Sequence, residues 1–353
     1  MNKNKLGWSL FFVVLAALSI WAVCAQSADF SPAAFTESIR QASLPWLLFA
    51  VLCMTGFILF EGLAVLSISR CLGYPAKVHR GILYSAADIY FSAITPSASG
   101  GQPACAFFMI KDGIPGAVTT VTLLINLILY ITATFITGIA GAAINPTLIS
   151  GFGVISRILI IIGCIVQFLL ITAFFLLLKK DDWIAAIGNK LLLFLHRIHL
   201  VKHLEKRQTQ LEVLVAEYRQ CSAMAAGQTR TLIPAFIFNL LQRICQISVC
   251  AAAYLATGGS MPHAADIWGI QSLVVLGSNS VPIPGSIGVA DYLLLDGLQG
   301  FMSKEAAVHL ELLSRSISFY CCILLSGLIA LLGYILLILK KRGMKRERDD
   351  RIL

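Results

Sequence analysis

The sequence predicts an all-α polytopic membrane protein with about six full spans and two broken helical hairpins. Of its 353 residues, 58% are hydrophobic and only 13% are charged, whereas soluble domains are about half apolar and a quarter charged. Several nearly uncharged runs are long enough to cross a ~30 Å hydrocarbon core. The clearest runs are 118–143, 158–178 and 317–339. Two further apolar segments are interrupted at their centres by proline and glycine.

Lysine and arginine set the expected orientation of these segments. They cluster within residues 3–5, 70–80, 179–207 and 340–351, and the connections 145–153 and 257–264 contain none. Because basic residues mark the cytoplasmic ends of spans, both termini are expected in the cytoplasm. The basic tail 340–353 could bind nucleic acid, but beside a membrane helix it favours a topology signal and contact with anionic lipid. No nucleic-acid partner is therefore expected.

The expected spans follow one another in alternating directions. The first, 6–24, lies behind Lys3 and Lys5 and could be a signal peptide, but its apolar stretch is long enough for a retained helix. The remaining spans are expected at 44–69, 117–144, 154–178, 229–257 and 308–339.

The two broken segments, 81–112 and 266–302, do not fit as full spans. The first begins and ends on the predicted cytoplasmic side, and the second begins and ends on the other. Each has two arms of roughly 12–17 residues, which at 1.5 Å per residue reach only part-way across a bilayer. Each is therefore expected to enter the membrane and turn back. New helices are expected to start near Gln102 and near Ser286 or Ile287.

The order of helix, break and helix occurs twice with opposite orientation. The first unit covers 44–144 and the second covers 229–339, within a single transmembrane domain, 1–353. This arrangement is typical of inverted repeats in transporters, which place broken helices around a midplane substrate site. The alternative is that two unrelated loops connect ordinary helices.

Residues 181–227 alternate apolar and charged positions at helical spacing, which predicts a cytoplasmic amphipathic hairpin. His196, His199 and His203 lie on one face of it. They could bind a metal, but no cysteine or carboxylate sits at matching spacing, so solvated histidines are favoured. Neither a metal nor a cofactor is expected.

The breaks imply a polar cavity, because non-helical backbone at membrane depth is tolerated only against protein or water. Helix starts there would direct free N–H groups and the positive end of the helix dipole at an anion. Ionisable residues inside spans are functional candidates by default. The candidate substrate-binding residues are Glu61, Asp88, Ser97, Ser99, Gly100, Gly101, Gln102, Asn239, Arg243, Pro284, Gly285, Ser286, Asp291 and Arg315.

Arg243 is the expected phosphate ligand, because Asn239, Gln242 and Gln246 on the same helix side supply only neutral partners. The carboxylates could bind a cation. Asp291 could pair with Arg315 or contact a lipid amine, and the contact is slightly favoured because Asp291 follows the break closely. Glu311, four residues before Arg315, is a second possible partner for that arginine. No HExxH, Walker or GxSxG pattern appears, so an enzyme is not expected.

Three patterns give the chain a family resemblance. They are TPSASGGQP from Thr95, PIPGSIGVAD from Pro282, and Arg315 within LLSRSISFY. Together they resemble the lysylphosphatidylglycerol synthase transmembrane (flippase-domain) family, which includes the membrane half of bacterial multiple-peptide-resistance factors. The family usually has a glutamate where this chain has Gln102, which argues against a strictly cationic substrate. It also has a second glycine where this chain has Ser286, and a glutamate where it has Asp291.

The resemblance implies a lipid flippase of the bacterial plasma membrane that moves an aminoacylated, lysylphosphatidylglycerol-like phospholipid between leaflets. Since no synthase domain follows before Leu353, translocation without synthesis is expected, with a role in antimicrobial peptide resistance. The expected partners are phospholipids, a separate lipid-modifying synthase and a second copy of the chain. A membrane-embedded lipid transferase and a non-transporting synthase partner are the alternatives.

Overall fold

The computed structural model describes residues 42–95, 98–179, 204–281 and 288–350. It also describes Thr36, Arg40, Ala186, Asn189, Lys190, Leu193 and Ser286. The predicted first span, 6–24, lies outside the described residues. So do most of 181–203, including the three histidines, and Ser97, Pro284 and Gly285.

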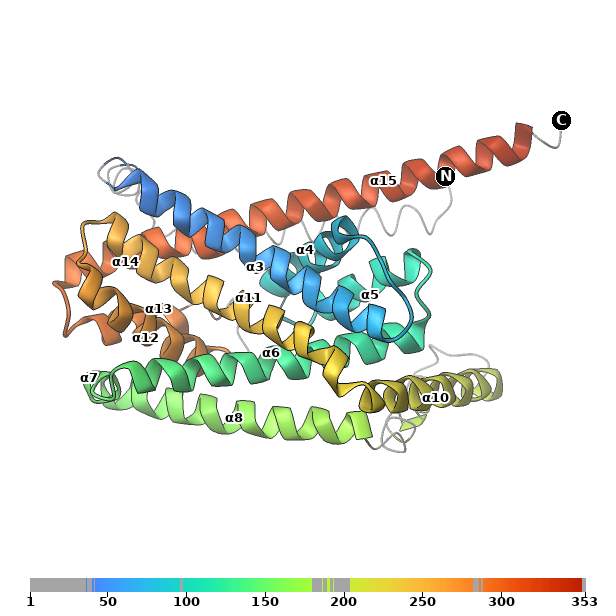
Figure 1. Cartoon of the computed structure of the whole chain (residues 1–353), viewed down its shortest axis with the longest axis horizontal. Helices are drawn as coiled ribbons and strands as arrows, with labels where there is room; N and C mark the ends of the chain where they lie inside the picture. The colour runs from blue at the N-terminus through green and yellow to red at the C-terminus, as the bar shows by residue number, and fades with distance from the viewer. Residues whose placement is uncertain are drawn as a thin grey trace.

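Five helical segments of the described part are long and apolar enough to cross a membrane, and they run along the length of the bundle (Figure 1). They are α3 (Leu44–Cys71), α6 (Gly116–Ile144), α8 (Val154–Lys179), α11 (Thr229–Ala256) and a continuous run of α14 (Lys304–Arg315), η4 (Ser316–Cys321) and α15 (Cys322–Asp350). Each lies where the sequence predicts a span. The polytopic all-α architecture is therefore confirmed for the described residues.

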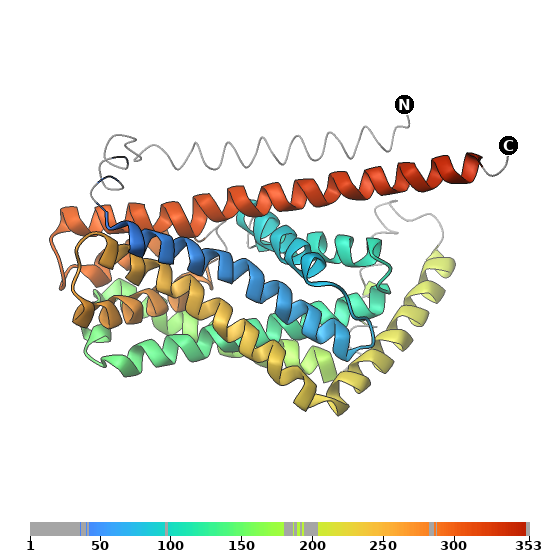
Figure 2. The same ribbon diagram turned by 45° about the horizontal axis from the view of Figure 1, so that its top comes forward.

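The two broken segments form two pairs of shorter helices. The first pair is α4 (Val78–Ile94) and α5 (Gly101–Lys111), and the second is α12 (Met261–Ser278) and α13 (Val289–Leu298). The first pair begins and ends where α3 ends and α6 begins, whereas the second begins and ends at the opposite end of the bundle (Figures 1 and 2). The two hairpins therefore point toward each other along the bundle.

The second helix start was predicted two to three residues too early. Helix α13 begins at Val289 rather than at Ser286 or Ile287. Ser286 and Gly288 both have positive φ, at 52° and 78°. This left-handed backbone is incompatible with a right-handed helix, so the helix can begin only after Gly288.

Some helix pairs map onto each other when the first unit is exchanged for the second, as would be expected for an inverted repeat. Helix α3 packs along α11, so the first helices of the two units face each other. Hairpin α4–α5 of the first unit packs through α4 on α15 of the second unit. Hairpin α12–α13 of the second unit packs through α12 on α6 of the first. These three pairings correspond when the two units are interchanged.

Helix α4 approaches α3 closely because two glycines meet at their crossing. A Cβ atom added to Gly62 would lie 2.6 Å from the carbonyl oxygen of Gly81. No side chain fits there without separating the helices. The hairpin is thereby held against the helix that carries Glu61.

We expect Gly62→Ala to lower the free energy of unfolding by about 1–3 kcal/mol, because overpacking of a tight contact costs that much. Thermal unfolding in detergent measures the change. The matched control is Gly116→Ala, at a position with nothing within 4 Å of the added Cβ. Equal melting temperatures for the two variants would show that the α3–α4 contact is not tight.

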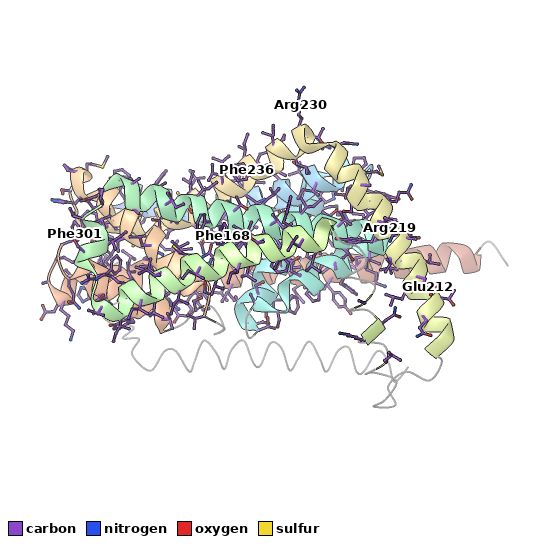
Figure 3. All side chains as sticks on the ribbon, turned by 90° about the horizontal axis from the view of Figure 1, so that it is seen from below. Phe168, Glu212, Arg219, Arg230, Phe236 and Phe301 are labelled. Carbon is purple, nitrogen blue, oxygen red and sulfur yellow. The ribbon has the colours of Figure 1, made fainter. Side chains whose placement is uncertain are left out.

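The outer face of the bundle is apolar along α8. Figure 3 shows Glu212 and Arg219 on α10 (Leu204–Gly227) at one end and Phe301 at the other, with Phe168 of α8 between them. The outer face of α8 is apolar and exposed, as at Ile158, Ile162 and Phe168. That face is suited to lipid contact. The short α7 (Leu148–Gly151) joins α6 to α8.

Candidate functional site

A cavity of about 660 Å³ lies where the tips of the two hairpins meet. Ser99 and Gln102 come to it from the first tip, and Ser280 and Ser286 from the second. The rest of the wall comes from helices α3, α4, α6, α8, α11, α12 and α13 and from the α14–α15 run. This volume falls within the usual range of ligand pockets, so the cavity can hold a lipid headgroup.

Most of the predicted site residues that the structure describes meet at this cavity. The predicted residues that line it are Glu61, Asp88, Ser99, Gln102, Arg243, Ser286 and Arg315. Asp291 lines a small adjoining pocket of about 40 Å³ with Glu311 and Arg315. Gly101 lies behind Asp88, and Asn239 is fully buried and donates to Asn126 at 3.0 Å. Gly100 holds the hairpin turn by donating its N–H to the Thr95 hydroxyl at 2.8 Å.

Arg243 is the most buried charge in the cavity wall, with 1% of its surface exposed. Its Nη1 donates to Gln246 at 2.5 Å and to the Tyr130 hydroxyl at 3.3 Å. Its guanidinium carbon lies 4.3 Å from the centre of the Tyr130 ring and 5.1 Å from that of Phe57. These contacts fix the orientation of the guanidinium without cancelling its charge. Among the described residues its Nε–H has no hydrogen-bond partner.

Glu61 and Asp88 form a pair of buried carboxyl groups on the facing sides of α3 and α4. They are 7% and 6% exposed, both line the cavity, and they interact electrostatically. Glu61 also accepts from Gln242 at 3.0 Å and from Ser85 at 3.3 Å. Asp88 accepts from Ser92 and from Gln102, both at 3.1 Å. All four donors are neutral.

The starts of α5 and α13 do not stand free for an anion, which corrects the expectation from the sequence. At α13 the Asp291 carboxylate accepts the Gly288 N–H at 2.9 Å, so the helix is capped by its own side chain. At α5 the Asp88 carboxylate lies so close to Gly101 that an added Cβ would meet its Oδ1 at 2.0 Å. A carboxylate is stabilised at a helix N-terminus. Each helix start therefore already faces a negative group of the protein.

Arg315 is paired with Asp291 of α13. The slight preference for a free Asp291 that contacts a lipid amine is therefore wrong for this structure, as is Glu311 as the ion-pair partner. Both members are partly buried, with 15% and 26% of their side chains exposed. A lone charge at such a position is costlier than a pair. The Arg315 Nη2 has no hydrogen-bond partner among the described residues.

Polar cavity residues that were not predicted from the sequence include Asn126 and Tyr130 on α6, Gln167 on α8 and Gln271 on α12. Gln167 donates to the Leu276 carbonyl at 3.0 Å. Its Oε1 and that of Gln271 have no partner among the described residues. The sequence signal for these two glutamines is an amide side chain inside an otherwise apolar span. No group of three or more potential metal-ligating side chains occurs in the part of the chain that the structure describes.

The hydrogen bond from Gln102 to Asp88 holds the tip of the first hairpin. We expect Gln102→Leu, which keeps the size but removes the donor, to lower the free energy of unfolding by about 1–3 kcal/mol. Thermal unfolding in detergent measures this. Gln299→Leu, at an exposed glutamine, is the control and should change stability little. If both variants unfold like the unaltered protein, the Gln102–Asp88 bond does not fasten the hairpin.

Comparison with known proteins identifies the family. Residues 8–326 match the family model described as the lysylphosphatidylglycerol synthase TM region. The match covers both hairpins and extends to the start of α15, so it includes every element that lines the cavity. A search of curated proteins found no match.

Proposed function

We propose that this chain, which belongs to the lysylphosphatidylglycerol synthase transmembrane-region family, moves a phospholipid between the two leaflets of the bacterial plasma membrane. The expected substrate is lysylphosphatidylglycerol or a related phospholipid. The headgroup would cross through the cavity while the acyl chains stay in lipid. In this proposal both termini are cytoplasmic, and the two hairpins are re-entrant from opposite faces.

Arg243 carries the proposal. It lies at the middle of α11, has an unpartnered Nε–H, and is held in place by uncharged groups. A phosphate diester is an anion with acceptor oxygens, and arginine binds such groups through directed, charge-assisted hydrogen bonds. A buried arginine with no carboxylate within ion-pair distance is suited to bind an anionic ligand transiently.

The rest of the cavity supplies contacts for the remainder of a headgroup. The unpartnered amide oxygens of Gln167, Gln242 and Gln271 can accept hydrogen bonds from hydroxyl or ammonium groups. Serine hydroxyls from both hairpin tips add donors. A zwitterionic or polyhydroxylated headgroup thus finds both donors and acceptors on its way across.

Reconstitution tests the proposal. Purified protein in phosphatidylcholine vesicles should equilibrate acyl-labelled fluorescent phosphatidylglycerol and lysylphosphatidylglycerol between leaflets, as measured with a membrane-impermeant quencher. Protein-free vesicles should keep the probe in its starting leaflet. Equal rates with and without protein would contradict the proposal. They would favour a non-transporting role beside a separate synthase, whereas a chemically altered probe would favour a transferase.

A further inference from the structure

The Glu61–Asp88 carboxyl pair lies in the cavity wall but is not suited to bind a phosphate directly, because both groups are acidic. Within the described residues no lysine, arginine or histidine lies within ion-pair distance of either group. Their hydrogen-bond donors are an amide or a hydroxyl in every case. Two carboxylates that face each other in a site of low polarity repel each other strongly, so one proton on the pair is the stable arrangement.

A second observation points into the same corner of the cavity. Gln242 is 1% exposed and donates to Glu61, while its Oε1 has no partner among the described residues. It lines the cavity beside Arg243. An unpaired acceptor next to two carboxyl groups is suited to a site that binds a proton from the cavity and releases it there.

Apart from α3 and α4, which carry the pair, the described titratable groups that face it come from α11, α5 and α15. Arg243 of α11 interacts electrostatically with Glu61, and it is the only cation among them in the described structure. The remaining neighbours are the thiols of Cys105 on α5 and Cys322 on α15. A thiol buried among apolar side chains is uncharged at neutral pH. The charge of this region therefore depends on Arg243 and on the number of protons on the carboxyl pair.

These charges link the two sites. With one proton on the pair, its single negative charge is balanced by Arg243. When an anionic phosphate binds Arg243, it competes for that positive charge and leaves the carboxylate without a partner. Taking up a second proton removes the excess negative charge. By reciprocity, protonation of the pair then strengthens phosphate binding by the same factor.

We propose that the Glu61–Asp88 pair is a proton site that couples inward or outward movement of an anionic phospholipid to movement of a proton in the same direction. This inference rests on the proposed function. A proton from water on one face binds the remaining carboxylate as the phosphate binds Arg243. When the cavity opens to the other face, the O–H bond breaks, the proton passes to water there, and the lipid leaves. A lipid of net charge −1 and one proton cross together without net charge.

The experiment uses the reconstituted full chain with acyl-labelled phosphatidylglycerol as probe. Potassium is kept equal on both sides with valinomycin, so no membrane potential develops. Without a pH gradient, the probe should reach equal amounts in both leaflets, which tests the proposed function alone. With a gradient of one pH unit, the probe should accumulate in the leaflet that faces the alkaline side. One proton per lipid limits the ratio to about tenfold. Reversing the gradient should reverse the ratio.

The outcomes separate the two proposals. Equal distribution under both gradients, with exchange present in their absence, would overturn the proton site and leave the flippase intact. No exchange in any condition would overturn both.

Variants assign the effect to the pair. In Glu61→Gln the ratio of probe between leaflets should fall to about one under either gradient, whatever its basal exchange rate. Asp88→Asn serves as the second variant if Glu61→Gln does not fold. The control Glu305→Gln removes an exposed carboxylate at the start of α14 and should keep the full ratio. An unchanged ratio in both folded cavity variants would overturn the assignment.

Discussion

Replacing Arg243 by glutamine should abolish lipid translocation, with a rate reduced at least tenfold, which corresponds to about 1.4 kcal/mol. The glutamine keeps a hydrogen-bond donor but loses the charge and the fork geometry on which phosphate binding depends. The leaflet-exchange assay measures the rate. Expression and the elution volume of the purified protein should be unchanged, because Arg243 has no carboxylate partner within ion-pair distance in the described structure.

Two further variants sharpen this test. Arg230→Gln removes an exposed arginine in the first turn of the same helix and should leave the rate unchanged. Arg243→Lys keeps the charge but not the stacking on Tyr130, so its rate should lie between those of Arg243→Gln and the unaltered protein. A fully active Arg243→Gln would remove Arg243 from the substrate path. A protein that unfolds would instead make Arg243 a structural residue.

Breaking the Asp291–Arg315 pair should produce a large loss of stability. Each single variant, Asp291→Asn or Arg315→Gln, leaves a partly buried charge without its partner. Because both groups keep some contact with solvent, each should lower the free energy of unfolding by about 1–3 kcal/mol, less than a fully buried pair would. The double variant should cost clearly less than the sum of the two. Thermal unfolding of the two single variants and the double variant in detergent gives the double-mutant cycle.

The same three proteins decide between the two roles of Asp291. Additive losses of stability would exclude the pair as a functional interaction. If Asp291 contacts a lipid amine, Asp291→Asn should lose its preference for lysylphosphatidylglycerol over phosphatidylglycerol in the exchange assay. The structure leads us to expect an unchanged preference, because the Asp291 carboxylate is already engaged by Arg315 and by the Gly288 N–H.

The long elements could be predicted from the sequence because membrane spans depend on length and charge alone. Helices α3, α6, α8 and α11 lie within a few residues of their predicted bounds. The helix break at Gly100–Gly101 was also predictable, since paired glycines weaken a helix and proline suits its first turn. Gly101 forms the first residue of α5. A shared site for Glu61, Asp88 and Arg243 was predictable, because an isolated charge in a membrane is costly and charged residues inside spans therefore gather around a polar cavity.

Some errors arise because partners on different helices cannot be identified from spacing. Glu311 stands one turn before Arg315, but the carboxylate that binds this arginine comes from α13. The start of α13 was assigned to an external anion, although Asp291 stands three residues after Gly288, a spacing at which an acidic side chain can cap a helix start. Gln167 and Gln271 carry no charge, and their place in the wall depends on how α8 and α12 pack.

The central claim is that two hairpins enter from opposite faces and meet around one cavity. Single cysteines placed at exposed positions that flank each hairpin, in a background without accessible native cysteines, test it most directly. Lys77 and Lys111 flank the first hairpin, and Met261 and Lys304 flank the second. An impermeant thiol reagent should label cysteines at the first two positions from one face only, and at the last two from the other face only. If either flanking pair were labelled from opposite faces, that hairpin would cross the membrane and the account would be contradicted.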